Sequence, residues 1–309
     1  MEIVFSFDTT GSMSSSITTV RQVLQDIMER LFADIPGLKV AMFAHGDYCD
    51  ARKSYVTKFV NFTNDVQKLC KFAQSTGPTG GGDADECYEL VLHQVRTELN
   101  WTPGTQRALV LIGDANPHEP SYHMNELKLD WRKETQELKE MGVRIYGVQC
   151  RDDYTVEPFY QHISDETGGV KIKLDDLSSI VQMLMAVCYR EKGPEFFQAF
   201  EQEVRRENEK ITRTLSGVFD ALRDGDVTID RAARADTPPV TEIDTTPLPS
   251  FKRKIDFDAV DDVTPSPKRH CSPLSNSGSW RRTPKMTTRS MKHRMALRKR
   301  PSIRLPKRI

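Results

Sequence analysis

Short, uninterrupted apolar runs alternate with segments of helical periodicity over residues 3–189. Residues 38–44 and 107–113 are two such runs, whereas the apolar residues between 17 and 31 recur at intervals of three and four. A strand that is apolar on both faces needs cover on both faces, and helices that alternate with strands supply it in parallel sheets. The sequence therefore predicts an α/β fold with a doubly wound, mostly parallel sheet over residues 1–192.

The positions of the expected elements follow from these patterns and from the Pro and Gly breaks between them. Strands are expected at residues 3–8, 38–44, 55–62, 107–113, 143–148 and 170–174. Helices are expected at 17–31, 65–73, 86–99, 122–140, 157–167 and 177–189, and one long charged helix at 195–222. The strand at 55–62 carries Lys and Asn, so we place it at an edge of the sheet.

Composition divides the chain into three regions. After the α/β domain at 1–192, a helical extension is expected at 193–225, followed by a Pro/Ser/Thr-rich tail at 226–309 without periodicity. Such a tail cannot bury a core, and we expect it to be disordered on its own. Residues 264–309 hold 14 of the 44 Lys and Arg residues and no Asp or Glu, which leaves residues 1–263 with a net charge of −14. An acidic body thus carries a basic tail.

Three features argue for an intracellular protein without a membrane partner. No run approaches the roughly 18 consecutive apolar residues of a membrane span. The chain starts with a strand-like run, without the basic segment and cleavage site of a signal peptide. The cysteines are scattered at positions 49, 70, 87, 150, 188 and 271 without a C-x-x-C pair, which is typical of reduced thiols that pack in the core.

Two of the expected strands end in an aspartate, at Asp8 and Asp114. Ligands of open parallel sheets bind outside the carboxyl ends of the strands, where the strand order reverses. Thr10 and Ser12 follow Asp8 at intervals of two, and Gly11 between them permits a tight turn. A carboxylate and two hydroxyls are oxygen ligands suited to a hard cation such as Mg²⁺. The alternative is that Asp8 and Ser12 only cap the helix that follows.

The turn after Asp8 resembles the metal-ion-dependent adhesion motif, D-x-S/T-x-S, of von Willebrand factor A domains. In that family, a threonine from a later loop and an aspartate at the end of a later strand complete the site. The Gly-rich loop at 77–83 resembles the loop and implies Thr79, with Thr76 as an alternative three residues earlier. The segment 111–115, Leu-Ile-Gly-Asp-Ala, resembles the strand end.

This resemblance covers about 190 residues and implies a Rossmann-like A domain of the intracellular type at 1–192, with nothing implied beyond it. The chain departs from adhesion members of the family at Thr10, where serine is commoner, and at Ala115, where glycine is usual. The implied metal ligands are Asp8, Thr10, Ser12, Thr79 and Asp114, for Mg²⁺ or Mn²⁺. Asp83 either points at the metal site or caps the helix that begins near residue 86, and we favour the cap.

The resemblance also implies a mode of action. Few carboxylates and several neutral hydroxyls would leave the charge of a bound cation partly uncompensated. An Asp or Glu of a partner protein can then occupy an open coordination position, which is the binding mode of the family. We therefore expect a protein-binding adaptor that engages an acidic residue of its partner.

Other candidate sites in the sequence are weaker. The segment 45–50, His-Gly-Asp-Tyr-Cys-Asp, either lines the partner surface or forms a turn with local hydrogen bonds. His118 and His123 alone supply too few ligands for zinc. The Gly-rich loop at 77–83 lacks the Gly-Lys-Ser/Thr of a phosphate-binding loop, and no serine stands in a G-x-S-x-G context. The sequence predicts no catalytic residues and no enzyme.

The basic tail has two possible uses. The clusters at 252–254 and 267–269 resemble the two halves of a nuclear import signal, and the basic residues between 280 and 309 are denser still. Flexible cationic chains also bind DNA or RNA by neutralising phosphates. The leading interpretation is nuclear targeting of the adaptor. The alternative is a nucleic-acid-associated protein that binds through its tail and uses the α/β domain as a scaffold.

Overall fold

The fold is described from a computed structural model, which describes residues 1–208 and 210–233. Predictions that fall on residues 234–309, which include both import-like clusters and most of the expected tail, lie outside the described residues. No helix among the described residues combines the length and apolar character that a membrane crossing requires.

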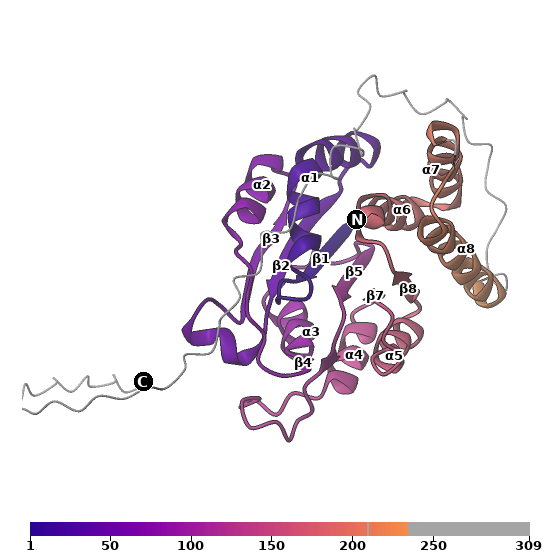
Figure 1. The fold of residues 1–309 in the computed structure, drawn as a ribbon. Coiled ribbons are helices and arrows are strands. Elements are labelled where there is room, and N and C mark those ends of the chain that lie inside the picture. Colours follow the sequence, from indigo (N-terminus) through magenta and orange to yellow (C-terminus); the bar gives the residue numbers. More distant parts are fainter. Residues whose placement is uncertain (209, 234–309) are drawn as a thin grey trace, which may run out of the picture. The chain divides into compact units, whose positions relative to one another are not determined.

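The central sheet has six strands in the order β3-β2-β1-β5-β7-β8, with helices on both of its sides (Figure 1). Its strands are β1 (Glu2–Asp8), β2 (Lys39–His45), β3 (Thr57–Thr63), β5 (Arg107–Gly113), β7 (Val143–Cys150) and β8 (Ile172–Leu174). All neighbouring pairs are parallel except β2–β3, which is antiparallel. This arrangement confirms the predicted α/β class and its mostly parallel sheet.

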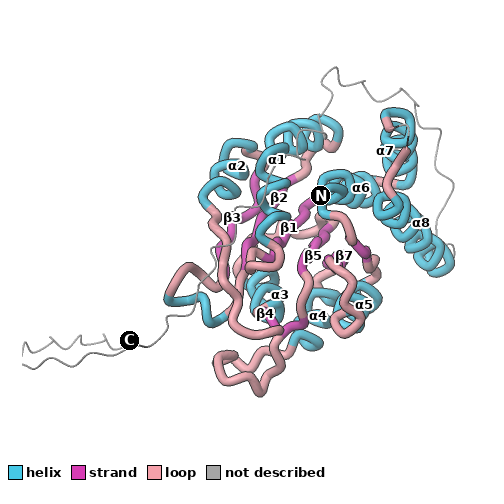
Figure 2. Tube along the Cα trace, viewed as in Figure 1, coloured by secondary structure: helices cyan, strands magenta, loops and turns pink. Residues whose placement is uncertain are grey.

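The helices that flank the sheet are α1 (Ser14–Asp34), α2 (Val66–Ser75), α3 (Tyr88–Thr97), α4 (Trp131–Glu140), α5 (Glu157–Thr167), α6 (Ile180–Lys192), α7 (Pro194–Glu207) and α8 (Arg213–Ala233). Helices α1 to α6 are separated from one another in sequence by strands, whereas α7 and α8 follow α6 directly (Figure 2). One hydrophobic cluster joins α1, α2, α6, α7 and α8 to one face of the sheet, and a second joins α3, α4 and α5 to the other. In β1, Ile3 and Phe5 belong to the first cluster and Val4 to the second. Both faces of the sheet are therefore buried, which explains the uninterrupted apolar runs.

The strand register brings the carboxyl ends of the central strands to one edge. Asp8 lies opposite His45 on β2, and Phe7 lies opposite Ile112 on β5. The chain passes from β1 to β2 on one side, and β5 then pairs with β1 on its other side. The strand order reverses at β1, and the ligand edge of the fold lies beyond Asp8.

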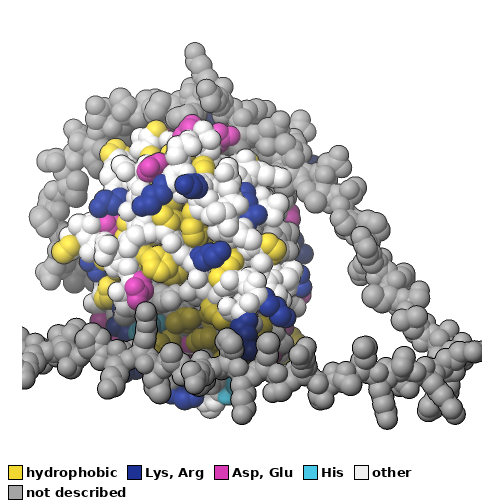
Figure 3. Space-filling view, turned by 90° about the vertical axis from the view of Figure 1, so that its left-hand side faces the viewer, with side chains coloured by type: hydrophobic (Ala, Val, Ile, Leu, Met, Phe, Trp, Pro, Cys, Tyr) yellow, Lys and Arg dark blue, Asp and Glu magenta, His cyan; other side chains and the backbone are white. Residues whose placement is uncertain are grey.

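Strand β3 closes one edge of the sheet, as its Lys and Asn residues predicted. Lys58 is exposed, and Phe59 stacks on Phe43 with ring centroids 4.8 Å apart. Lys and Arg side chains are scattered over this side of the molecule, among apolar ones (Figure 3). Charged residues on an edge strand oppose edge-to-edge association with another sheet.

The helices predicted at 86–99 and 122–140 begin later than expected. Asp85 and Glu86 form the short strand β4, which pairs with β6 (Asn116–Pro117), and α3 starts only at Tyr88. The predicted helix at 122–140 is wrong before Trp131, because Asn125 organises the preceding segment as a loop. Its buried side-chain amide accepts from the N–H of Leu129 and donates to the carbonyl of the same residue, both at 2.9 Å. A side chain that binds backbone groups in this way competes with helix formation.

The single helix predicted at 195–222 is wrong, because the chain forms two helices, α7 and α8. Asn208 ends α7 in an extended conformation, with φ −112° and ψ 121°, and its side-chain amide donates to the carbonyl of Val204. The break lets Phe200 of α7 and Phe219 of α8 contact each other, with centroids 6.3 Å apart. Phe200 also packs on Tyr189 of α6. Helix α8 continues to Ala233, past residue 226 where the tail was expected to begin.

Candidate functional site

The carboxylate of Asp8 lies at the carboxyl end of β1 and is fully buried. Its Oδ1 accepts from the N–H of Thr10 at 2.8 Å and from the hydroxyl of Thr10 at 2.6 Å. Its Oδ2 accepts from the hydroxyl of Tyr88, on α3, at 2.6 Å. Burial raises the pKa of Asp8 to about 6, assisted by the charge of Asp114 and opposed by the hydrogen bonds from Thr10 and Tyr88. Burial thus disfavours the charged form, which a cation would restore.

Four of the five predicted ligands converge at this edge of the sheet. The hydroxyl of Thr10 lies 3.3 Å from that of Ser12, and Ser12 donates to Oδ1 of Asp114 at 3.0 Å. Asp8 and Asp114 come from different strands, as the sequence predicted, and the turn connects their carboxylates through two hydroxyls. Helix α1 begins after this turn with Met13 as its N-cap residue. The partners of Asp8 therefore belong to the site rather than to the first turn of α1.

Thr79 is buried beside the site, but its hydroxyl points to a different neighbour. Its Oγ1 lies 3.2 Å from the hydroxyl of Thr9, and its N–H donates to the Thr9 carbonyl at 2.8 Å. A Cβ on Gly46 would lie 2.5 Å from Thr79 Oγ1, so this packing requires glycine at position 46. The hydroxyl of Thr76, the alternative ligand, donates to the carbonyl of Phe72 in α2. Neither hydroxyl is hydrogen-bonded to the other four predicted ligands.

Asp50 fixes the Gly-rich loop above the Asp8 turn. Its carboxylate accepts from the N–H groups of Gly80 at 2.9 Å and Gly81 at 3.0 Å. It also takes part with Asp47 in a reciprocal cap of the short 3₁₀ helix η1 (Tyr48–Arg52). Of the two interpretations of segment 45–50, the turn with local hydrogen bonds is observed. This turn also holds the loop that covers the site.

Glu86 was not identified from the sequence. It lies in β4, is 5% exposed, and its Oε2 has no hydrogen-bond partner among the described residues. Burial raises the pKa of Glu86 to about 10, with further contributions from the carboxylates of Asp8, Asp47 and Asp50 and then of Asp114. The acidic run at 83–86 was a signal, but the sequence did not show which of its side chains faces inward.

Arg151, in the loop after β7, was also missed. Its Nε lies 3.2 Å from Oδ2 of Asp114, and its Nη2 donates to the carbonyl of Ser12 at 2.7 Å. Arg151 has a positive φ of 65°, which is uncommon for a residue other than glycine, and its side chain is 61% exposed. An exposed cationic group therefore lies directly beside the oxygen cluster.

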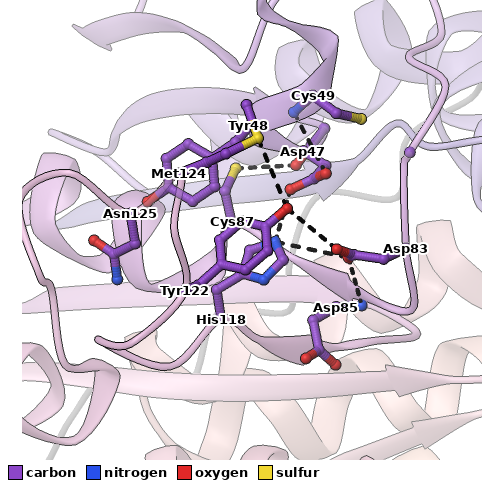
Figure 4. Close-up of polar contacts among 12 residues, drawn as sticks. Asp47, Tyr48, Cys49, Asp83, Asp85, Cys87, His118, Tyr122, Met124 and Asn125 are labelled. Atoms are coloured by element: carbon purple, nitrogen blue, oxygen red, sulfur yellow. Dashed lines mark hydrogen bonds and ion pairs between the residues drawn. The ribbon is translucent and has the colours of Figure 1, made fainter.

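A second polar group includes Asp83, at the end of the Gly-rich loop (Figure 4). Asp47, Asp83 and His118 can each present a ligand atom, and these atoms lie within 4.8 Å of one another. His118 Nε2 is 2.7 Å from Asp47 Oδ1, and the ring of Tyr122 stacks on His118 with a centroid distance of 3.7 Å. His123 is not part of this group.

The prediction that Asp83 caps α3 is wrong. The N-cap residue of α3 is Cys87. Asp83 instead accepts from the N–H of Asp85 at 3.3 Å and from the hydroxyl of Tyr122 at 3.1 Å, the latter shown in Figure 4. The strand β4 occupies the position where the sequence predicted the first turn of the helix, so the aspartate has no helix N-terminus to cap.

A scan against protein families matches residues 2–185 to the von Willebrand factor type A domain. The chain belongs to this family. Domains of this type commonly mediate protein interactions and often bind a divalent metal, so the resemblance seen in the sequence is confirmed at the level of the family. The match ends within α6, and α7 and α8 lie beyond it.

Individual relatives of this A domain are distant. An ariadne-like RING finger protein of Acanthamoeba polyphaga mimivirus is 21% identical over 189 residues, which cover 57% of this chain but only 18% of that protein. Among solved structures, the pilus adhesin SpaC of Lactobacillus rhamnosus GG is similar with a TM-score of 0.48 and 13% identity, over 62% of this chain and 30% of that one. Proximal thread matrix protein 1 of the mussel byssus has a TM-score of 0.46 and 14% identity, over 60% and 44% of the two chains.

The residues at the Asp8 turn of this A domain fit a hard divalent cation. Two carboxylates and two hydroxyls form a continuous set of oxygen atoms with contacts of 2.6 to 3.3 Å. Magnesium and manganese prefer oxygen ligands and retain some water. Asp8, Thr10, Ser12 and Asp114 are the side chains that would hold the ion, whereas the hydroxyl of Thr79 faces Thr9.

Proposed function

We propose that this protein is an intracellular adaptor whose A domain binds a partner protein through a divalent cation, Mg²⁺ or Mn²⁺, at the Asp8 turn. The observation that carries the proposal is the convergence of Asp8, Thr10, Ser12 and Asp114. Two strands and one turn, up to 106 residues apart, present oxygen atoms at the edge where ligands of such sheets bind.

The chain's own residues define how a partner would approach. Asp8 is buried and held by Thr10 and Tyr88, so it forms the floor of the site. Ser12 and Asp114 are only partly buried and lie toward solvent, next to Arg151. When bound, the cation would supply a positive charge that accepts a carboxylate oxygen of the partner. Arg151 would add a second positive group for the same carboxylate.

The proposal is for binding and not for catalysis. Among the described residues, the side chains around the turn include no hydroxyl activated by a neighbouring histidine. His45 pairs with Ser6, and burial lowers the pKa of His45 to about 3, so that it stays neutral. His45 lies on β2 under the site, where its ring packs edge-on against the ring of Tyr88.

The direct test is affinity capture of partners with the full chain, comparing wild type, Asp8→Ala and wild type in chelator. Capture should be lost in the variant and in chelator, and restored in wild type by added Mg²⁺ or Mn²⁺. Asp26→Ala, which removes an exposed carboxylate of α1, is the matched control and should capture partners normally. Partner recovery that survives both Asp8→Ala and chelator contradicts the metal-dependent mechanism.

For the basic tail we propose nuclear targeting, supported by the clusters at 252–254 and 267–269. The test is the nuclear fraction of tagged full-length protein, which should fall when both clusters are replaced by alanine. Unchanged nuclear accumulation in that variant contradicts the proposal.

The alternative function is nucleic-acid binding by the tail, which is favoured by 14 basic and no acidic residues in 264–309. Gel shifts at several salt concentrations should then show binding that weakens steeply with salt. Binding should be absent from a chain that ends at residue 233. Equal binding by the full and the shortened chain argues against the tail as the contact.

A further inference from the structure

Glu86 is the buried acidic group that the proposed site leaves unexplained. The residue is 5% exposed, and Oε2 has no hydrogen-bond partner among the described residues. Neighbouring buried carboxylates are satisfied: Glu89, three residues later, accepts from the hydroxyl of Tyr48 at 2.7 Å and from the N–H of His118 at 3.0 Å. A buried carboxylate without a donor is costly, and native proteins keep such groups mainly where an ion or a ligand satisfies them.

The carboxylate of Glu86 and Thr10 of the Asp8 turn border the same small space beside Gly81. A Cβ placed on Gly81 would lie 3.1 Å from Glu86 Oε1 and 3.6 Å from Thr10 Cβ. Gly81 has a positive φ of 72°, and its missing side chain leaves open the space between the carboxylate and the turn. The Gly-rich loop therefore brings Glu86 next to Thr10 without placing a side chain between them.

The backbone around Glu86 fixes this position. Glu86 pairs with Pro117 in the parallel β4–β6 ladder, three residues after Asp114. Its carbonyl accepts from the N–H of His118 at 3.3 Å. Strand β4, which carries Glu86, is thus joined to the segment that follows Asp114. Glu86 and Asp114 are therefore held in one structural unit.

We infer that Glu86 is a further carboxylate ligand of the metal centre. Its carboxylate supplies an oxygen in place of the Thr79 hydroxyl, which faces Thr9, and adds a negative charge. The inference rests on the proposed function, because it assigns Glu86 to the same site. With Asp8, Asp114 and Glu86, the centre has three carboxylates. Greater ligand charge favours tight retention of the cation and leaves less positive charge for a partner's carboxylate. The site is then built to keep its ion while the partner is exchanged.

The test measures cation affinity and stability of the full chain. After treatment with chelator, wild type and Glu86→Gln are titrated with Mn²⁺ and Mg²⁺ in a calorimeter, and their thermal unfolding is followed with and without the ion. Glu86→Gln should weaken Mn²⁺ affinity about tenfold or more. The metal-free variant should melt at or above the wild-type temperature, because a buried carboxyl group without a hydrogen-bond partner is replaced by an amide of the same size. Glu86→Asp keeps the charge and should bind Mn²⁺ with an affinity between those of wild type and Glu86→Gln.

Glu89→Gln is the matched control, because Glu89 is equally buried but fully hydrogen-bonded. It should lower the melting temperature of the metal-free protein and leave Mn²⁺ affinity within about twofold, since no metal role is assigned to it. If Glu86→Gln behaves like this control, with unchanged Mn²⁺ affinity and a lower melting temperature, the inference is overturned.

The two proposals fail in different ways. If wild type binds Mn²⁺, Asp8→Ala abolishes binding and Glu86→Gln does not weaken it, the assignment of Glu86 is wrong while the Asp8 site stands. If Glu86→Gln weakens Mn²⁺ binding but partner capture is insensitive to chelator, the assignment of Glu86 stands and the proposed adaptor mechanism is wrong. A wild-type chain that binds neither ion overturns both.

Discussion

Asp8 shows how much of the candidate site depends on single side chains. Both of its oxygens have donors, from Thr10 and Tyr88, and yet burial raises its pKa to about 6. Glu86 Oε2 has no hydrogen-bond donor within residues 1–208 and 210–233. The site therefore combines two buried acidic groups, Asp8 and Glu86, with one exposed positive group, Arg151. These residues have opposite effects on a bound cation, which makes them separable by mutation.

Arg151→Ala should bind Mn²⁺ about three- to tenfold more tightly than wild type, because a positive charge beside Asp114 repels the ion. The same variant should capture an acidic partner less well. Calorimetric titration and affinity capture check the two effects. Arg132→Ala, which removes an exposed arginine that pairs with Glu119, is the control and should leave Mn²⁺ affinity unchanged. Weaker Mn²⁺ binding by Arg151→Ala would contradict the prediction that its charge repels the ion.

His118 provides a pH-dependent contribution. Burial opposes its protonation, but the hydrogen bond to Asp47 and the charges of Glu89, Asp47 and Asp83 raise the pKa of His118 above 6.5. A group whose pKa is higher in the folded than in the unfolded state adds its full stability at pH values below the unfolded pKa. That stability is lost as the pH rises through the folded pKa. His118→Gln should therefore cost more stability near pH 6 than near pH 9. Chemical unfolding in chelator at both pH values measures this, and an equal cost at the two values would contradict it.

Four site residues could be predicted from the sequence because their positions depend only on the fold class. Asp8 and Asp114 end neighbouring parallel strands, and Thr10 and Ser12 follow within one turn. Glu86 and Arg151 could not be predicted, because their positions near the turn depend on the conformation of the Gly-rich loop and on the positive φ of Arg151. Such conformations are set by tertiary contacts, for example the hydrogen bonds of Asp50 to the loop.

At the scale of elements, the strands were predicted more closely than the helices. Buried parallel strands are mostly apolar, so their limits lie close to the ends of apolar runs. Helices at the surface are interrupted by single polar residues whose side chains bind the backbone. Asn125 replaces the first turns of a predicted helix with a loop, and Asn208 divides another. Neither interruption is visible in the spacing of apolar residues.

The division at Asn208 makes α8 part of the core. Phe219 is fully buried between Phe197 and Phe200 of α7, so Phe219→Ala should lower the free energy of unfolding by about 3–5 kcal/mol. Urea unfolding of the 1–309 chain measures the change. Leu127→Ala, at a residue that is 66% exposed, is the control and should change it little. A loss below about 1 kcal/mol would mean that α8 does not contribute to the core.

At the scale of the whole molecule, the sheet order has a consequence for synthesis. β1 lies between β2 and β5, and Phe7 pairs with Ile112, 105 residues later. A growing chain can pair β1 with β2 early, but the other edge of this strand, which is fully buried in the folded domain, has no partner until β5 has left the ribosome. Long-range parallel strand pairing is slow, and the intermediates that precede it expose apolar surface and are prone to aggregate. We expect nascent chains that stop before residue 107 to associate with chaperones, and those long enough for residues 107–113 to have left the ribosome to be released from them.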